Sequence, residues 1–173
     1  MDHIYKTILE MLSDRNYIIN YPINNMITKI NDNLLVYFIE DNKVGINNIK
    51  SVQEALDDYN VKHCIVIFNG SITAFAKTYI HKLTEQNYEL EFFNSQELAY
   101  NITHHSLVPE HKLLNIDEKN ALLKHYNVSE KHLPCILRTD PVARYFNAKP
   151  GNIFQILRPS DVSFKSISYR IVI

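Results

Sequence analysis

The sequence predicts an α/β N-terminal module with a mostly parallel sheet, followed by a small α+β domain with a mixed sheet. Apolar runs of strand length alternate with amphipathic segments in the first part of the chain, which is the pattern of βαβ crossovers. The charge then changes sign, because residues 1–103 carry 8 Lys and Arg against 13 Asp and Glu, whereas residues 104–173 carry 10 against 6. Such a split indicates two modules with different partners. We therefore expect domains at 1–103 and 104–173, joined at a polar stretch.

Helices and strands alternate in the N-terminal module. Apolar residues recur at helical spacing over 2–14, 49–60 and 73–83, and apolar runs of strand length cover 34–40, 63–68 and 88–94. A strand without polar residues is typical of a sheet that is buried on both faces. We therefore expect a sheet covered by helices on each side.

The C-terminal domain carries explicit helix-start signals. Asn115 is an N-cap residue followed by an acid, Glu118, at the third helical position, and it opens a helix that runs to about Tyr126. We expect Ala121, Leu122 and Tyr126 to face inward.

A second and shorter helix starts at Asp140-Pro141. The aspartate is a capping carboxylate, and the proline stands where its missing N–H costs nothing. Residues 152–158 and 167–173 alternate between apolar and polar, like strands with one face in water. This order of elements predicts the small α+β domain.

Composition excludes several classes of protein. A chain of 173 residues buries a core without staples, and its 3 glycines disfavour a glycine-rich phosphate loop. No secretory signal is visible, and no apolar run approaches the ~20 residues of a membrane span, so we expect a soluble intracellular protein. A net charge of −1 lacks the basic footprint of an autonomous nucleic-acid binder. Cys64 and Cys135 lie in apolar runs, where buried free thiols are expected rather than a disulfide or a reactive thiol.

No pattern of catalytic or metal-binding residues stands out. His104, His105 and His111 are close in sequence, but adjacent side chains point in different directions and no cysteine lies near them. Glu89 and Glu91 share one face of a predicted strand, as acids of a Mg²⁺-dependent nuclease would, yet no lysine follows in that strand. We expect no catalytic residue, no metal and no cofactor, and a nuclease stays as a rival hypothesis.

Arginines and aromatic residues mark the C-terminal domain. Four arginines follow Arg15, and they lie on or beside the predicted short elements together with aromatic side chains: Arg138, Arg144, Arg158, Arg170, Tyr145, Phe146, Phe154 and Tyr169. The planar fork of arginine suits bidentate pairing at interfaces, and Arg and Tyr are frequent hot spots of binding. Two interpretations stay open: internal salt bridges with core aromatics, or an obligate docking surface for a larger protein.

Four stretches of this domain resemble one family. They are NITHHSLVPEH (101–111), IDEKNALLKHYNVSEKHLP (116–134), DPVARYF (140–146), and LRPSD (157–161) with the closing SYRIVI. On these stretches the chain resembles the small RNA polymerase subunit shared by the three eukaryotic nuclear polymerases, a family that also has archaeal members. The resemblance covers 101–173 nearly without gaps and extends to KVGINNIK (43–50) and to 70–77.

The resemblance implies that the second domain is an assembly domain that docks on the largest polymerase subunit. It also implies that the first domain forms a jaw beside downstream DNA, shorter here than in typical eukaryotic members. The expected docking residues are Leu107, Pro109, His111, Arg138, Asp140, Pro141, Arg144, Tyr145, Arg158, Pro159, Tyr169 and Arg170.

The resemblance also points to a loop close to DNA. The family's Thr-Pro-Ser-Ala reads Thr73-Ala74-Phe75-Ala76 here, followed by Lys77. Thr73 and Lys77 are the expected DNA-proximal residues, since hydroxyls and lysines make sequence-independent contacts with phosphates.

We therefore expect a non-catalytic subunit of a multisubunit DNA-directed RNA polymerase. Its expected partners are the largest subunit, the other polymerase subunits and, weakly and without sequence specificity, downstream DNA; no membrane and no small-molecule substrate are expected. The alternative is a free-standing regulator that binds the polymerase through the same domain. The expected location is the nucleus for a cellular protein, and the host cytoplasm or the virion for a viral one.

Overall fold

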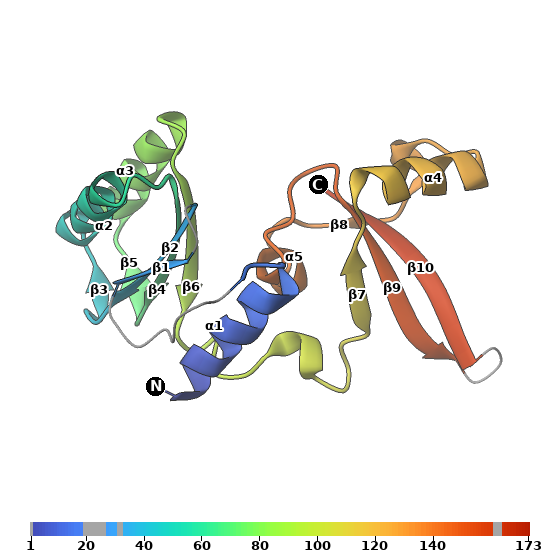
Figure 1. Ribbon diagram of the computed structural model, residues 1–173, viewed down its shortest axis with the longest axis horizontal. Helices are drawn as coiled ribbons and strands as arrows, with labels where there is room; N and C mark the ends of the chain where they lie inside the picture. Colours follow the sequence, from blue (N-terminus) through green and yellow to red (C-terminus); the bar gives the residue numbers. More distant parts are fainter. Residues whose placement is uncertain (1, 19–26, 31–32, 161–163) are drawn as a thin grey trace. The chain divides into compact units, whose positions relative to one another are not determined.

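The computed structural model describes residues 2–18, 27–30, 33–160 and 164–173 (Figure 1). Contacts within the chain divide it into two compact units, residues 1–100 and 101–173. This division lies three residues before the expected boundary between 103 and 104, so the expected domain limits stay a prediction. Among the described residues, no helix is long and apolar enough to cross a membrane.

The first unit is built from alternating helices and strands. Its elements are α1 (Asp2–Asp14), β1 (Ile27–Ile30), β2 (Leu34–Ile39), β3 (Lys43–Val44), α2 (Ile46–Asp58), β4 (His63–Phe68), β5 (Ser71–Ile72), α3 (Ala74–Glu85) and β6 (Glu89–Asn94). The main sheet has the order β1-β2-β4-β6. Strands β2, β4 and β6 are parallel, whereas β1 is antiparallel to β2. Strands β3 and β5 form a separate parallel pair. The expected mostly parallel sheet is therefore present.

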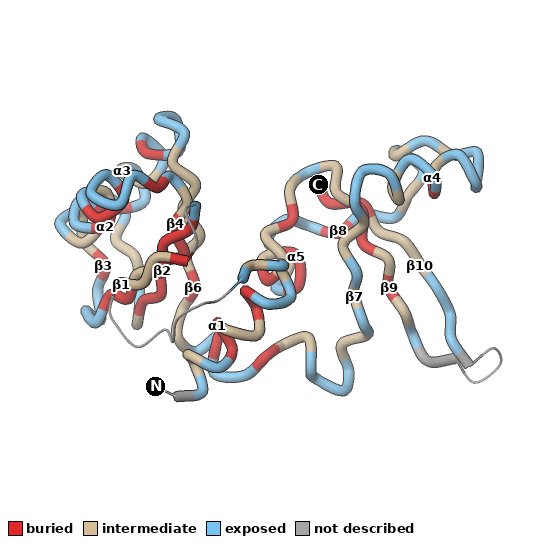
Figure 2. Tube along the Cα trace, viewed as in Figure 1, coloured by how far each residue is buried: buried red, intermediate tan, exposed pale blue. Residues whose placement is uncertain are grey.

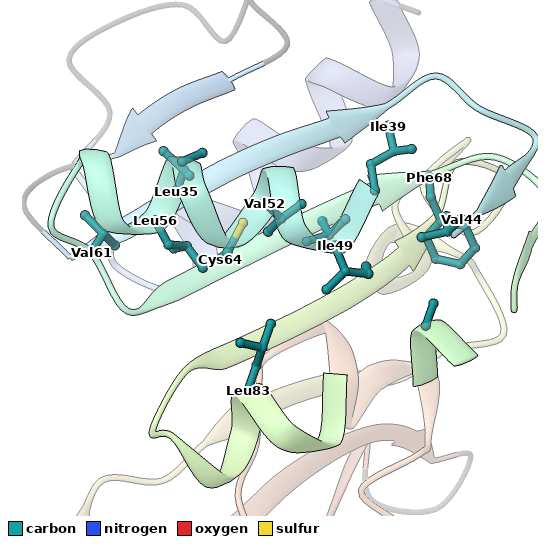
Figure 3. Close-up of a cluster of buried hydrophobic side chains, with 13 residues drawn as sticks. Leu35, Ile39, Val44, Ile49, Val52, Leu56, Val61, Cys64, Phe68 and Leu83 are labelled. Carbon is teal, nitrogen blue, oxygen red and sulfur yellow. The ribbon is translucent and has the colours of Figure 1, made fainter. Parts of the chain in front are cut away.

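Helices cover both faces of this sheet. Helices α2 and α3 pack on one face, and Leu56, Cys64 and Leu83 belong to the apolar cluster between these helices and the sheet (Figure 3). Helix α1 lies against the opposite face, because the ring of Tyr5 is 5.0 Å from that of Phe38 in β2. Strand β4 is buried from end to end after its first residue. Its unbroken apolar run follows from burial on both faces.

The second unit combines a mixed sheet with short helices. Its elements are η1 (Ile102–His104), β7 (Glu110–Leu113), α4 (Ile116–Tyr126), η2 (Glu130–His132), β8 (Cys135–Ile136), α5 (Pro141–Tyr145), β9 (Ile153–Ser160) and β10 (Phe164–Val172). The sheet order is β7-β9-β10-β8. Neighbours are antiparallel except β10 and β8, which are parallel. The mixed sheet is thus the one that the sequence predicts.

The two faces of this sheet carry different helices. Phe154 and Ile156 point to the face on which α5 packs through Ala143. Ile153 and Ile171 point to the other face, where they contact Leu122 of α4. Both faces are therefore covered at the start of β9, where Ile153 and Phe154 are both buried, and the strand becomes exposed by Arg158 (Figure 2).

The caps of both helices agree with their sequence signals. The side chain of Asn115 accepts a hydrogen bond from the Glu118 amide at 2.8 Å, and the Glu118 carboxylate accepts one from the Asn115 amide at 2.9 Å. Asp140 accepts from the Val142 amide at 2.9 Å and is followed by proline at the first position of α5. Capping residues thus fix where α4 and α5 begin.

Two burial expectations were wrong. Leu122 is buried, but Ala121 and Tyr126 of α4 are exposed. Cys64 is buried, whereas Cys135 is exposed, because it lies in β8 at the edge of the sheet. In both cases the local sequence is apolar enough for a core, and only the position of the element decides which residues are covered.

Candidate functional site

Two of the expected docking residues around α5, Asp140 and Tyr145, are held in place by internal hydrogen bonds. Tyr145 is 3% exposed, and its hydroxyl oxygen accepts a hydrogen bond from Nδ2 of Asn101 at 3.1 Å. This bond ties η1 to α5. Arg144 lies half-buried in the last turn of the same helix. Tyr145 therefore lies beneath the surface and supports it, whereas Arg144 is placed to reach the surface.

The segment before β7 lies at the surface. Leu107 is 85% exposed, which is unusual for a large apolar side chain. The backbone carbonyl of Pro109 lies 2.7 Å from Nδ1 of His111. The His111 ring packs edge-on against Phe154 with 5.8 Å between the centroids. An exposed Leu107 thus precedes a histidine anchored in the core.

Strand register places several of the expected residues on one face of the sheet. Side chains in register across antiparallel strands share a face, and so do residues two apart in one strand. Arg170 pairs with Phe154 and His111 with Ile156, so both lie on the α5 face. Arg158, two residues beyond Ile156, belongs to it too and is exposed.

The remaining expected residues lie elsewhere. Tyr169 is on the opposite face, where its ring is 6.0 Å from that of Tyr126 in α4. Arg138 is exposed after β8, and its amide donates to the carbonyl of Ile173 at 2.9 Å. Pro159 lies in β9, and Asp161 of the LRPSD stretch is outside the described residues.

A groove on the α4 face was missed by sequence reasoning. Its volume is about 550 Å³, and it is lined by Leu114, Glu118, Ala121, Leu122, His125, Tyr126, Gln155 and Tyr169. Its one signal in the sequence was the pair of apolar α4 residues, Ala121 and Tyr126, that the helix pattern assigned to the core. They line the groove instead.

The expected DNA-proximal residues stand at the start of α3. Thr73 is the N-cap: its hydroxyl donates to the Val44 carbonyl at 3.1 Å and accepts from the Ala76 amide at 3.3 Å. Lys77 is exposed one turn further on, and Phe75 between them is 76% exposed. The Thr73 hydroxyl therefore fixes the helix start, and Lys77 presents the available charge.

Glu91, one of the two acids considered for a nuclease, is engaged in internal contacts. Glu91 bonds Arg15 and lies 2.7 Å from Nε2 of His63. Within the described ranges, no group of three or more His, Cys, Asp or Glu side chains is placed to hold a metal ion.

Comparison with known proteins adds independent findings. Residues 100–172 match the family described as RNA polymerase Rpb5, C-terminal domain. A protein of Dictyostelium discoideum named DNA-directed RNA polymerases I, II, and III subunit rpabc1 is 38% identical over 188 residues, which covers 98% of this chain and 95% of that protein. Proteins of Caenorhabditis briggsae and Caenorhabditis elegans named as the RPABC1 subunit of the same polymerases are each 39% identical over 142 residues, covering 82% of this chain and 67% of theirs.

Proposed function

The chain belongs to the Rpb5 family of RNA polymerase subunits, and from this membership we propose that it is a non-catalytic subunit of a multisubunit DNA-directed RNA polymerase. The observation that carries the proposal is the 38% identity to a shared subunit of polymerases I, II and III over 98% of this chain. The similarity includes both units, so the proposal concerns the whole chain rather than one domain. Other subunits of the polymerase are its partners.

We assign docking on the largest subunit to the second unit. Arg158, Arg170 and His111 share the face on which α5 packs. Arg144 is on α5 itself. A surface rich in arginine suits bidentate pairing with carboxylates of a partner. The net charge of the segment 104–173, with 10 basic against 6 acidic residues, favours an acidic partner surface.

We assign a place beside downstream DNA to the first unit. Lys77 and Phe75 are exposed at the start of α3, and Thr73 holds that start in place. The acidic balance of residues 1–103, with 13 acidic against 8 basic residues, is compatible with guiding a duplex by a few contacts and not with gripping it. Nucleotidyl transfer is assigned to the large subunits.

The test is purification of the tagged chain from its source cells, with stoichiometry read by mass spectrometry. We expect one copy of the chain beside two very large polymerase subunits. Recovery of the chain alone would overturn the proposal. Trace recovery beside the polymerase would favour the free-standing regulator instead. Fractionation of the same cells tests the nuclear location proposed for a cellular protein, against the cytoplasmic or virion location of a viral one.

A further inference from the structure

Strand β10 is covered on one side and open on the other. It pairs with β9 at every position from Phe164 to Ile171, but with β8 only at Ile171 and Val172. The stretch 165–170 therefore forms an edge of the sheet, although β10 stands inside the sheet order. Figure 1 shows β10 extending well past the short β8.

The register decides which backbone groups face the open side. The Val172 amide donates to the Asn152 carbonyl, whereas the Ile171 amide donates to the carbonyl of Pro134, on the β8 side. Directions alternate along a strand, so Ile167 and Tyr169 also turn their N–H and C=O groups to the β8 side. Neither residue has a backbone partner there among the described residues. Two residues thus offer a row of unmatched donors and acceptors.

The side chains beside this edge are apolar and lie next to the groove. Ile167 is 53% exposed and pairs with half-buried Leu157 in register. Tyr169, two residues on, points to the same face and lines the groove beneath α4. The exposed ring of Tyr126 closes the other side of that groove, 6.0 Å from Tyr169. The open backbone and the groove therefore form one continuous surface.

We propose that an extended segment of another polymerase subunit adds as a strand to the β10 edge and places an apolar side chain in the groove under α4. In this mode of recognition, backbone hydrogen bonds supply affinity, and pockets for alternate side chains supply specificity. The proposal deepens the function proposed above and rests on it. It differs from the arginine surface because Tyr169 and the groove are on the opposite face of the sheet.

The charge around the β10 edge favours one kind of partner segment. Lys124 and Lys131 are exposed on α4 and η2, and Lys165 is exposed on β10, two residues before Ile167 and on the same face. A partner segment with acidic residues flanking its apolar one is therefore complementary. A second copy of this chain would bring an equally basic domain to the same edge and would be repelled.

The test compares Ile167→Pro with Ile167→Val in the tagged full-length chain. Proline removes the N–H that points to the open side and leaves the β9 ladder intact, whereas valine keeps both the N–H and a branched apolar side chain. We expect the polymerase recovered per tagged chain to fall about tenfold for proline, which corresponds to a loss of about 1.4 kcal/mol of binding free energy. For valine, we expect recovery to stay near the natural level. Equal recovery with both variants would overturn the strand addition.

Amide hydrogen exchange keeps the proposal testable if the proline variant fails to fold. We expect exchange in the peptide around Ile167 and Tyr169 to slow about tenfold or more when the natural chain is within the purified polymerase, relative to the isolated chain. Unchanged exchange in a stoichiometric complex would sink the strand addition and leave the proposed function standing. Absence of polymerase from the purification would instead remove the proposed function. Protection that depends on the concentration of the isolated chain would identify a second copy as the occupant and overturn the choice of partner.

Discussion

Arg15 and Glu91 form a doubly hydrogen-bonded ion pair inside the first unit. Nη1 and Nη2 of Arg15 donate to Oε1 and Oε2 of Glu91 at 2.9 and 2.8 Å. The two side chains are 5% and 11% exposed. Arg15 directly follows α1 and Glu91 lies in β6, so the pair fastens the end of the helix to the sheet. The acid that resembled half of a nuclease site is thus a structural anchor.

Replacing Arg15 should destabilise the first unit strongly. The Arg15→Met variant leaves the Glu91 carboxylate buried with His63 as its remaining partner, and breaking one side of a buried pair costs about 3–5 kcal/mol. The measurement is the free energy of unfolding of the full chain in urea. Lys6→Met is the matched control, because Lys6 pairs with Glu10 at 3.9 Å and its side chain is 76% exposed. That control should change stability by less than about 0.5 kcal/mol. Equal effects of both variants would refute the anchor role.

Glu91 should also make stability depend on pH. Burial alone would raise the pKa of Glu91, but the hydrogen bonds and the charges of His63 and Arg15 together outweigh burial and hold the pKa below its usual value. A carboxyl group with a lower pKa in the folded state adds stability above its unfolded pKa of about 4.3 and loses it as the pH falls through the folded pKa. We expect the unfolding free energy of the natural chain to fall below about pH 4.3 more steeply than that of Glu91→Gln. Parallel curves from urea titrations between neutral and acid pH would contradict this.

Helix starts and buried strands were predictable because their signals are local. A capping side chain needs only the amides that follow it, as Asn115 and Asp140 demonstrate. An apolar run such as that of β4 reports burial on both faces without any knowledge of its neighbours. The α/β class of the first unit and the mixed sheet of the second unit were predicted from signals of this kind.

Features that depend on register or on edges could not be predicted from the sequence. The strand pairings β3–β5 and β10–β8 are short, and whether they form depends on where the longer strands end. The exposure of Cys135 and Tyr126 follows from the same cause. The partners of the docking residues stay a prediction, because a single chain determines only which side chains it presents.

Gly70 should tolerate no side chain. Its φ is +75°, and a Cβ there would overlap the backbone carbonyl of Asn42. That carbonyl already accepts a hydrogen bond from Ser71 of β5 at 3.3 Å. We expect Gly70→Ala to lower the unfolding free energy by more than about 2 kcal/mol. Gly45→Ala is the control, since the nearest atom to its Cβ would be Oδ1 of Asn48 at 3.6 Å, and it should cost less than about 1 kcal/mol. Thermal unfolding of both variants measures the difference, and similar melting temperatures would count against the backbone argument.

The two cysteines should differ in reactivity. Cys64 is fully buried, and burial raises the pKa of its thiol. Cys135 is exposed at the sheet edge. Because only an accessible thiolate attacks, we expect a thiol reagent to modify one cysteine per folded chain and both after denaturation. The Cys135→Ser variant should react only after denaturation. Rapid modification of that folded variant would show that Cys64 is accessible and would contradict its place in the core.

Arg144→Ala should weaken incorporation into the polymerase more than it lowers the stability of the chain. Arg144 is half-buried at the end of α5, where truncation removes a charged contact point but no part of the apolar core under Ala143. Loss of an arginine that acts as a hot spot of binding costs about 2 kcal/mol or more, which corresponds to about a thirtyfold loss of affinity. The measurement is the polymerase recovered per folded tagged chain, with unfolding free energies measured in parallel. Lys50→Ala, which removes an exposed cation on α2 of the first unit, controls for charge alone and should leave recovery nearly unchanged. If Arg144→Ala instead lowered stability and left recovery per folded chain intact, its role would be internal, as the alternative interpretation of the arginines holds.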